Sequence, residues 1–409
     1  MSAPARVGGR TYYPHVEGLR GVAALYVFLF HIWQLAIQNT ATGTLLGWFA
    51  FTPFMQYGHF AVVAFIVISG YCLALPVALR PDMRFDAKTF FLRRARRLMP
   101  AYVPVVLLSV LPFCAVALLQ GRAINVPHVV LAVALHLGLI HNLSFATTEY
   151  LNGPLWSIAL EAQIYVVFAL LLIPVWRRFG LAAQLGLALV LGLVPHFMLH
   201  SLDWTSPWLC GLFAMGVVAA AFTARASSMP KLPWKVLAVL AGVVAIALIA
   251  PFSDGVTPDG ALWPMDVALG AAVALFFVAA VHDDRIPLAR FLASRTVVLL
   301  GTFSYSLYLI HAPLVDLTSA ILHRVHAGTL ASAIVWSALI PAVLLLAYGF
   351  YRVFERPFLS SGFRKAMDIE TGATGGAEAD ATVPSAASAS VQTLSEEIVV
   401  TDLAARPAI

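Results

Sequence analysis

Eleven long stretches with little charge limit what this chain can fold into more than any other feature does. Each has 17 to 24 residues, and most of the charged residues lie in the segments between them. A helix needs about 20 residues to cross the hydrocarbon core of a bilayer. Because the stretches are continuously apolar rather than alternating, they predict helices and not the strands of a barrel. They lie near residues 18–37, 58–79, 100–119, 127–143, 154–175, 181–199, 205–223, 233–250, 262–281, 297–319 and 330–353.

Composition excludes a water-soluble globular enzyme. Hydrophobic residues make up 61% of the 409 positions and charged residues 11%, whereas a soluble domain carries about 25% charged residues. The sequence therefore predicts an all-α polytopic membrane protein. Its three cysteines all lie in apolar stretches, so they indicate neither a disulfide framework nor a zinc site.

The formal net charge of +5 conceals an uneven distribution along the chain. Residues 366–409 contain seven acids and one arginine, so residues 1–365 carry a net charge of +11. Such a basic excess is typical of the cytoplasmic loops of membrane proteins, and no nucleic-acid partner is expected. Residues 359–409, rich in Ala, Ser, Thr and Gly, are expected to form a disordered cytoplasmic tail. Residues 1–358 then form a single membrane domain.

The basic clusters indicate which apolar stretch is not a full crossing. Placing all the clusters inside requires an even number of crossings between successive clusters. The interval between Arg97 and Arg177 contains three stretches, of which 127–143 is the shortest and is interrupted by histidines. We therefore expect about ten spans, with 127–143 re-entrant or peripheral and both termini cytoplasmic. Eleven full spans remain an alternative. The basic segment 84–98 is expected to form an amphipathic helix on the inner surface.

Two ionisable residues share one face of the first span. Arg20 and His31 are eleven residues apart, which corresponds to three turns and about 16 Å along a helix axis. Ionisable groups within a span are expensive and are candidates for function. His31 is therefore a candidate catalytic base. The alternative is a snorkelling arginine and a hydrogen-bonded core histidine.

Four arginines in five residues precede Pro100: Arg93, Arg94, Arg96 and Arg97. The guanidinium group binds phosphate oxygens in a bidentate way, so a phosphorylated cytoplasmic ligand is one interpretation. The other is an anchor that contacts anionic lipid and sets the topology.

Two further spans carry polar stripes. Ser157, Glu161 and Tyr165 follow one another at intervals of four residues, and a buried carboxylate at Glu161 needs a cation or a donor as partner. A pair between His31 and Glu161 would be an oriented general base, and the alternative is a structural ion pair. In the second span, Ser304, Tyr308 and His311 share a face, and these three with Trp156 are candidate substrate contacts. A polar contact between helices is the alternative. No metal-binding spacing and no phosphate-binding glycine loop is present.

Together these segments resemble the acyltransferase family 3 integral membrane proteins. These are bacterial O-acyltransferases that modify surface polysaccharides, lipopolysaccharide O-antigen, Nod factors and some macrolides. The resemblance runs from about Val16 to Phe358 and rests on six motifs in order, with departures at Ala64–Phe65 and at His59. The motifs are EGLRGVAALYVFLFH at 17–31, FIVISGY at 65–71, FFLRRARRLMPAY at 90–102, PLWSIALEAQIY at 154–165, SYSLYLIHAPL at 304–314 and ERPF at 355–358.

The resemblance implies a site and a reaction. A family member has ten core spans in the bacterial inner membrane, takes acyl-CoA (usually acetyl-CoA) from the cytoplasm and acylates a hydroxyl that is often on the far side. His31 would be the essential base, Arg20 and Glu161 would support it, and Arg94 and Arg97, with the adjacent Arg93, would bind the CoA phosphates. No permanently bound cofactor and no metal is expected.

Several alternatives remain at this point. The acceptor is expected to be a glycan or glycolipid, or else a small secreted metabolite such as a macrolide sugar. Transfer is expected to be direct, with a covalent acyl-histidine relay as the alternative. A secondary transporter is the rival from another class, although the chain has no inverted repeat or pair of matching broken helices.

Overall fold

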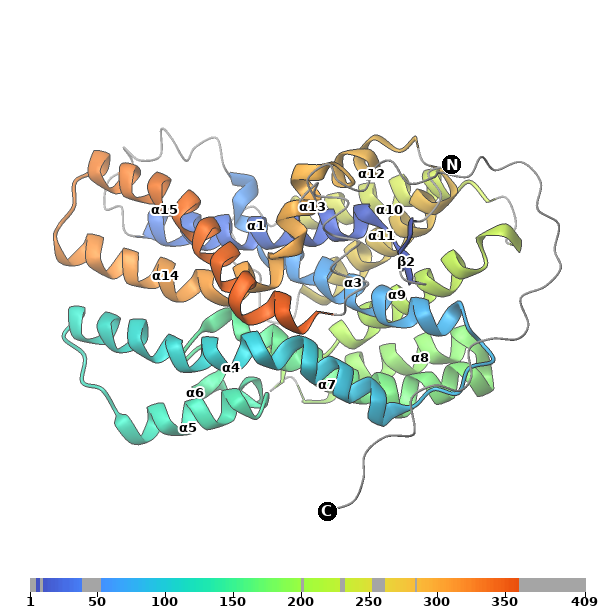
Figure 1. The fold of residues 1–409 in the computed structure, drawn as a ribbon, viewed down its shortest axis with the longest axis horizontal. Helices are drawn as coiled ribbons and strands as arrows, with labels where there is room; N and C mark the ends of the chain where they lie inside the picture. The colour runs from blue at the N-terminus through green and yellow to red at the C-terminus, as the bar shows by residue number, and fades with distance from the viewer. Residues whose placement is uncertain are drawn as a thin grey trace, which may run out of the picture. The chain divides into compact units, whose positions relative to one another are not determined.

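The structure, a computed structural model, describes residues 5–7, 10–38, 53–199, 202–228, 232–251, 262–283 and 285–359. Apart from a short antiparallel pair of strands, β1 (Ala5–Val7) and β2 (Arg10–Tyr12), the regular elements over these ranges are helices. The prediction of a helical polytopic membrane protein is confirmed. Figure 1 shows the helices in chain order.

The helices have the following bounds. The α-helices are α1 (Pro14–Gln38), α3 (His59–Ala78), α4 (Ala87–Leu119), α5 (Val126–Leu137), α6 (Phe145–Thr148), α7 (Trp156–Val167), α8 (Ile173–Leu199), α9 (Leu209–Ala224), α10 (Trp234–Ile249), α11 (Leu262–His282), α12 (Pro287–Leu292), α13 (Arg295–Thr302), α14 (Ser304–Arg324) and α15 (Thr329–Phe350). Short 3₁₀ segments are η1 (Pro53–Tyr57), η2 (His141–Leu143), η3 (Gly153–Leu155), η5 (Asp203–Thr205), η6 (Ala226–Ser228) and η8 (Arg356–Phe358), and π-helical turns are η4 (Phe168–Leu172) and η7 (Tyr351–Glu355).

The expected count of ten spans is not confirmed. Eight helical stretches in the described part of the chain are long and apolar enough to cross a membrane. One of them, Gly153–Leu199, contains two of the predicted spans, and Gly180 interrupts it with φ 88° and ψ 176°. Glycine adopts this backbone conformation without steric cost. The predicted span at 233–250 corresponds to α10, which has only 16 residues.

Helix α4 differs from its predicted form. The sequence indicated a surface helix over 84–98 followed by a separate span, whereas one helix of 33 residues runs through Pro100, Pro104 and Pro112. It begins where the carboxylate of Asp86 accepts hydrogen bonds from the backbone amides of Lys88 and Thr89, each 3.2 Å long. Prolines are tolerated inside membrane helices because neighbouring groups satisfy the freed carbonyls. The arginines of 93–97 therefore belong to the same rigid helix as the span.

The length of helix α5 agrees with the expectation that 127–143 is not a full crossing. It has 12 residues, fewer than the roughly 20 that a crossing needs. Asn125 caps it by accepting a hydrogen bond of 3.1 Å from the amide of His128. In Figure 1, α5 returns alongside the outer part of α4, and the two helices are in contact.

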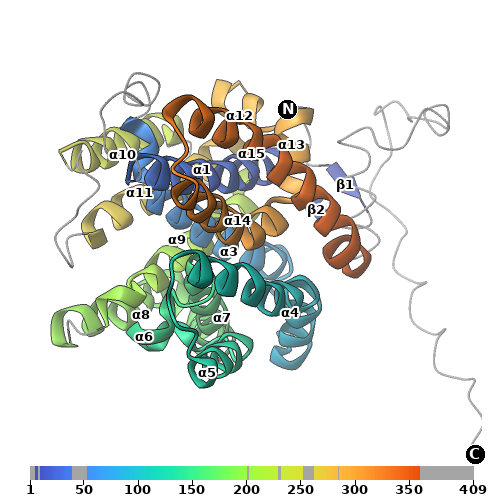
Figure 2. The same cartoon turned by 90° about the vertical axis from the view of Figure 1, so that its left-hand side faces the viewer.

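The buried core lies around α3 and α9. Viewed along the helices in Figure 2, these two lie between α1 with α10–α15 and the group of α4, α5, α7 and α8. The two helices cross closely at two glycines. A Cβ on Gly70 would lie 2.0 Å from the carbonyl oxygen of Phe213, and one on Gly216 would lie 2.1 Å from that of Val67. Small residues at such crossings allow helix backbones to approach one another in membranes.

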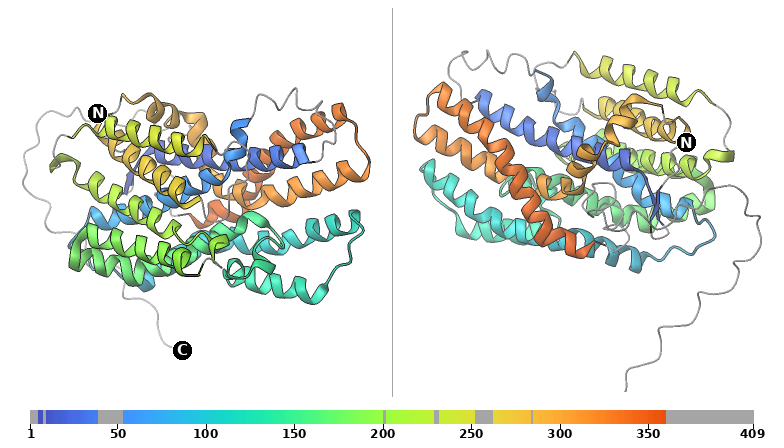
Figure 3. Two further views of the ribbon diagram at one scale, coloured as in Figure 1. Left: turned by 180° about the vertical axis from the view of Figure 1, so that it is seen from behind. Right: turned by 45° about the horizontal axis from the view of Figure 1, so that its top comes forward.

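The outer helices present apolar side chains outward. Helices α10 and α11 pack side by side at the periphery, as Figure 3 shows from behind. Exposed leucines and valines in rows are expected where a helix faces lipid. Such rows occur on α4 (Leu107, Leu111, Leu118), α10 (Val236, Val239, Val243) and α15 (Leu330, Leu345, Leu346).

The expected disordered tail at 359–409 lies, apart from Leu359, outside the described residues. Leu359 itself is buried. The boundary at 358 therefore remains a prediction.

Candidate active site

Arg20 is held at the junction of α1 and α3. One of its terminal nitrogens, Nη1, lies 3.0 Å from each carboxylate oxygen of Glu17, and the other, Nη2, lies 3.8 Å from the sulfur of Cys72. Glu17 is buried, so this ion pair is largely removed from water. A close contact between Gly21 and Gly301 sets α1 against α13 nearby: a Cβ on Gly21 would lie 2.5 Å from the amide nitrogen of Gly301.

His31 lies next to a second imidazole, contributed by α14. The ring centroids of His31 and His311 are 5.2 Å apart, with their planes inclined at 38°. The ring centroid of Phe30 lies 5.0 Å from that of His31. Gln34, one turn further along α1, is a hydrogen-bond partner of His31.

His311 has one ring nitrogen without a partner. Its Nδ1 lies 3.1 Å from the carbonyl oxygen of Leu307. A carbonyl only accepts, so Nδ1 carries the proton and Nε2 is left with a lone pair. The side chain is completely buried, and Nε2 has no hydrogen-bond partner among the described residues. A buried acceptor without a partner is an exception in folded proteins and calls for an explanation.

Tyr308, one turn before His311, is fixed by a hydrogen-bond cluster. Its hydroxyl lies 2.7 Å from the hydroxyl of Ser157 and donates to the carbonyl oxygen of Pro154 at 3.0 Å. The rings of Tyr308 and His311 are 5.6 Å apart. The structure therefore brings together Tyr308, His311 and the start of α7, where Trp156 is partly buried against the core.

Ser304, a predicted substrate contact, forms its hydrogen bond with the backbone of the preceding turn. It is buried and donates a hydrogen bond of 2.8 Å to the carbonyl oxygen of Gly301 in the preceding turn. Its hydroxyl thus stabilises the start of α14.

Glu161 belongs to a second polar group, on α7. Its carboxylate accepts a hydrogen bond of 2.7 Å from Tyr165, whose hydroxyl is 3.2 Å from that of Ser69. The positive charges of Arg20 and Arg94 act on the same group. Among the described residues, no hydrogen bond or ion pair links Glu161 with His31. The expected pair of imidazole and carboxylate is therefore not formed in this structure.

The arginines of α4 point in different directions. Arg93 is exposed, whereas the Nε of Arg94 is buried without a hydrogen-bond partner. The charges of Glu161 and Arg97 act on Arg94. A buried guanidinium that lacks part of its hydrogen bonding is suited to an anionic ligand.

Arg97 forms an ion pair that connects α4 with η7. Its Nη1 lies 2.5 Å from a carboxylate oxygen of Glu355, the last residue of η7. Ser306 donates to the other carboxylate oxygen at 2.6 Å, and the guanidinium carbon lies 5.8 Å from the ring centroid of Tyr305. The carboxylate is fully buried, and the ion pair joins α4, α14 and η7.

Sequence reasoning missed another buried carboxylate, Asp266 on α11. It is completely buried, lies 3.0 Å from the Nε2 of His59 and accepts a hydrogen bond of 2.7 Å from the indole of Trp208. The sequence signal that could have identified Asp266 is the presence of an acid inside an apolar span. Its partners are too distant in sequence to be inferred.

The segment before α7 contains a further pair of imidazoles. His136 and His141 stack with ring centroids 3.7 Å apart and planes inclined at 10°, and both are fully buried. Burial lowers the pKa of His136, and it lowers the pKa of His141 to about 3. Both rings are therefore neutral at physiological pH. Among the described residues, no three metal-binding side chains come together.

Comparison with known proteins supports the resemblance. The family model described as an acyltransferase domain matches residues 13–352. The chain belongs to this family. Relatives of the acyltransferase family include the peptidoglycan O-acetyltransferase OatA of Listeria monocytogenes, which is 24% identical over 386 residues covering 87% of this chain and 57% of the relative. A protein of Staphylococcus aureus provisionally named an O-acetyltransferase is 24% identical over 382 residues, covering 86% of this chain and 58% of its own length.

The chain thus spans little more than half the length of these curated relatives. No solved structure matches it.

Proposed function

We propose that the chain is a membrane-bound O-acetyltransferase that moves an acetyl group from acetyl-CoA at the cytoplasmic side to a hydroxyl of a surface or exported glycan. Membership of the acyltransferase family and the names of its relatives support this class of reaction. The observation that carries the proposal is the pair of imidazoles, His31 and His311, with one buried acceptor nitrogen left free.

The imidazole pair supplies the base. As the acceptor hydroxyl attacks the thioester carbonyl, an O–C bond forms, and collapse of the intermediate breaks the C–S bond. The hydroxyl proton passes to the imidazole of His31 and from it to the sulfur, so CoA leaves as the thiol. General-base catalysis of this kind contributes about 10²- to 10⁴-fold to the rate. His311 lies close enough to hold the hydroxyl or to share the proton.

The cationic group at the inner end of α1 and α4 holds the donor. Arg94, with its unsatisfied Nε, and the exposed Arg93 are the proposed partners of the CoA phosphates. Arg20 keeps a positive charge on the path between these phosphates and His31, and the charge of Glu161, which accepts a hydrogen bond from Tyr165, acts on Arg20 and Arg94. Arg97, already paired with Glu355, holds α4 in place so that Arg94 points inward.

The acceptor lies on the side of the imidazoles formed by Tyr308, Ser157 and Trp156. Glycan acceptors are favoured over a small metabolite because a relative is named a peptidoglycan O-acetyltransferase. The proposal includes a position in the inner membrane with both termini in the cytoplasm, so that the donor site faces the acetyl-CoA side.

The test is a reconstituted transfer reaction. The full chain in proteoliposomes is given acetyl-CoA labelled in the acetyl group and soluble peptidoglycan fragments, and the label on the glycan is measured by mass spectrometry. Wild-type protein should label the glycan, and His31→Ala should remove transfer while leaving expression intact. Absence of label with peptidoglycan and other envelope glycans, or undiminished transfer by His31→Ala, would refute the proposal.

A further inference from the structure

A cavity opens at the inner ends of α3, α8 and α9, away from the imidazole pair. Its volume is about 220 Å³. This is below the roughly 300–1,000 Å³ of a pocket that encloses a whole drug-sized ligand, so the cavity fits one end of a larger molecule. Three polar or aromatic side chains and four small or apolar ones form its wall: Trp176, Arg177, Arg225, Val77, Ala78, Pro81 and Ala221.

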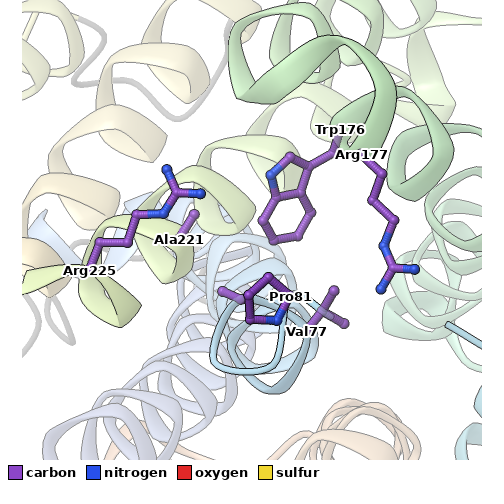
Figure 4. A pocket seen from close by; sticks show the side chains of 7 residues that line it. Val77, Pro81, Trp176, Arg177, Ala221 and Arg225 are labelled. Atoms are coloured by element: carbon purple, nitrogen blue, oxygen red, sulfur yellow. The ribbon is translucent and has the colours of Figure 1, made fainter. Parts of the chain in front are cut away.

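The side chains are arranged for a flat ring and an anion. Figure 4 shows the indole of Trp176 between the guanidinium groups of Arg177 and Arg225, with Pro81 and Val77 below. The guanidinium of Arg177 donates a hydrogen bond of 2.6 Å to the carbonyl oxygen of Met83, which fixes it. That of Arg225 makes no hydrogen bond or ion pair with any described residue and is free for a ligand.

The surroundings are strongly basic. The three segments that form the wall, residues 76–84, 174–180 and 221–228, contain five arginines and a single acid, Asp82. Such a concentration of one sign of charge around a concave site attracts anions. Guanidinium groups bind phosphate, and an aromatic face stacks on a nucleobase.

We propose that this cavity binds the nucleotide end of the acyl-CoA donor, with adenine against Trp176 and the 3′-phosphate of the nucleotide against Arg225 and Arg177, which leaves the diphosphate to Arg93 and Arg94. This inference rests on the proposed function. It assigns the donor a second anchoring point, separate from Arg93 and Arg94, at the membrane surface.

The geometry of α1 and α3 connects the cavity with the imidazoles. The two helices are antiparallel, because Phe30 meets Gly58 at one end and Arg20 meets Cys72 at the other. Val77 is five residues beyond Cys72, about 8 Å along the axis. Arg20 and His31 are about 16 Å apart on α1. The path from the cavity past Arg20 to His31 is thus about 24 Å, comparable to an extended acyl-CoA molecule.

A lipid headgroup is the competing occupant, because tryptophan and arginine are common at membrane interfaces. The nucleotide is favoured because the indole forms one wall of a concave site beside an unpaired guanidinium. The experiment must separate the two occupants.

The experiment compares two donors in nanodiscs of pure phosphatidylcholine, which lack anionic lipid. One donor is acetyl-CoA, and the other is S-acetyl-4′-phosphopantetheine, which lacks the nucleotide. The variants are Trp176→Leu and Arg225→Gln. Arg178→Gln is the matched control, because Arg178 lies outside the cavity wall with its guanidinium carbon 5.4 Å from the ring centroid of Phe179. Binding of adenosine 3′,5′-bisphosphate is measured in parallel by calorimetry, and melting temperatures show whether each variant is folded.

Loss of stacking or of a phosphate contact should lower kcat/KM for acetyl-CoA by at least about fivefold, chiefly through KM. Turnover of the phosphopantetheine donor should not change, and bisphosphate binding should weaken to the same extent. The inference would be overturned by equal losses of kcat/KM with both donors or by no loss with acetyl-CoA. It would also be overturned if neither substitution changed the affinity for the bisphosphate. Failure of the wild type to use either donor would instead refute the proposed function, while bisphosphate binding still reports on the cavity.

An effect that appears only when phosphatidylglycerol is added to the nanodiscs would assign the cavity to lipid and would also overturn the inference.

Discussion

The imidazoles of His31 and His311 lie with their ring centroids 5.2 Å apart, although 280 residues separate them in the sequence. One comes from the first helix and the other from the middle of α14. Since the Nδ1 of His311 is bonded to its own helix, only its Nε2 can face a ligand or share a proton. This relationship makes His311 a participant in the proposed reaction.

Replacing His311 with asparagine should lower kcat by about 10²- to 10⁴-fold, the usual contribution of a general acid or base. The KM for acetyl-CoA should change little, because the donor phosphates are proposed to bind elsewhere. Initial rates at saturating glycan, together with a pH–rate profile, measure the effect.

His282→Asn is the matched control for this substitution. His282 also bonds its Nδ1 to the carbonyl oxygen four residues earlier, at 2.8 Å from Val278, but it lies beside Trp234. The His282→Asn variant should retain wild-type turnover. If His311→Asn melts early yet turns over normally per folded molecule, His311 is structural.

The ion pair of Arg97 and Glu355 should matter for stability. Removing one partner leaves a charge without compensation, and breaking a buried pair costs about 3–5 kcal/mol. Glu355→Met should therefore lower the unfolding free energy by about 3 kcal/mol, since Arg97 retains 23% exposure. The double variant Arg97→Met/Glu355→Met should recover much of this loss. Unfolding in mixed micelles measures it.

The exposed neighbour Arg96 provides the control, and Arg96→Met should leave stability within about 0.5 kcal/mol of the wild type. A double variant that is no more stable than Glu355→Met alone would contradict the role of uncompensated charge.

How much of the fold and of the candidate site could be predicted depends on how local each feature is in the sequence. Arg20, His31, Glu161 and His311 were identifiable because a polar residue in an apolar span stands out. The helical membrane fold followed from the same contrast. These features need only the residue and its helix.

Pairing across the sequence could not be predicted. Glu355 lies 258 residues from Arg97, and Asp266 lies 207 from His59. Such contacts exist only after the helices pack. For the same reason, the sequence offered both His31 and Arg20 as partners of Glu161, whereas packing gives Glu161 a hydrogen bond from Tyr165. The continuous course of α4 through Pro100 is likewise a tertiary effect.

The stacked pair of His136 and His141 should make stability depend on pH. In the unfolded chain a histidine binds a proton below about pH 6.5, whereas burial keeps His141 neutral down to about pH 3. The unfolded state then binds more protons, so stability falls as the pH is lowered from about 6.5 towards 3, by up to about 1.4 kcal/mol per pH unit for this group. His141→Phe should reduce that slope.

The measurement is the melting temperature between pH 8 and pH 4.5. At pH 8 both states are neutral at this position, so any difference between variant and wild type there reports packing alone. An unchanged slope in His141→Phe would show that other groups govern the acid sensitivity.

The crossing of α3 and α9 should be intolerant of a single methyl group. A Cβ on Gly70 would meet the carbonyl oxygen of Phe213 at 2.0 Å, and the neighbour is backbone that cannot turn aside. Overpacking typically costs about 1–3 kcal/mol, so Gly70→Ala should lower the unfolding free energy by at least that amount. Because α3 also carries Cys72, which contacts Arg20, kcat should fall as well.

Gly242→Ala on α10 is the counterpart, because nothing lies within 4 Å of its Cβ position. Alanine is the better helix former by about 1 kcal/mol, so this variant should be as stable as the wild type or more stable. Equal stability of Gly70→Ala and Gly242→Ala in the same unfolding assay would show that the two helices can separate freely. In that case the close crossing would not be what places Cys72 beside Arg20.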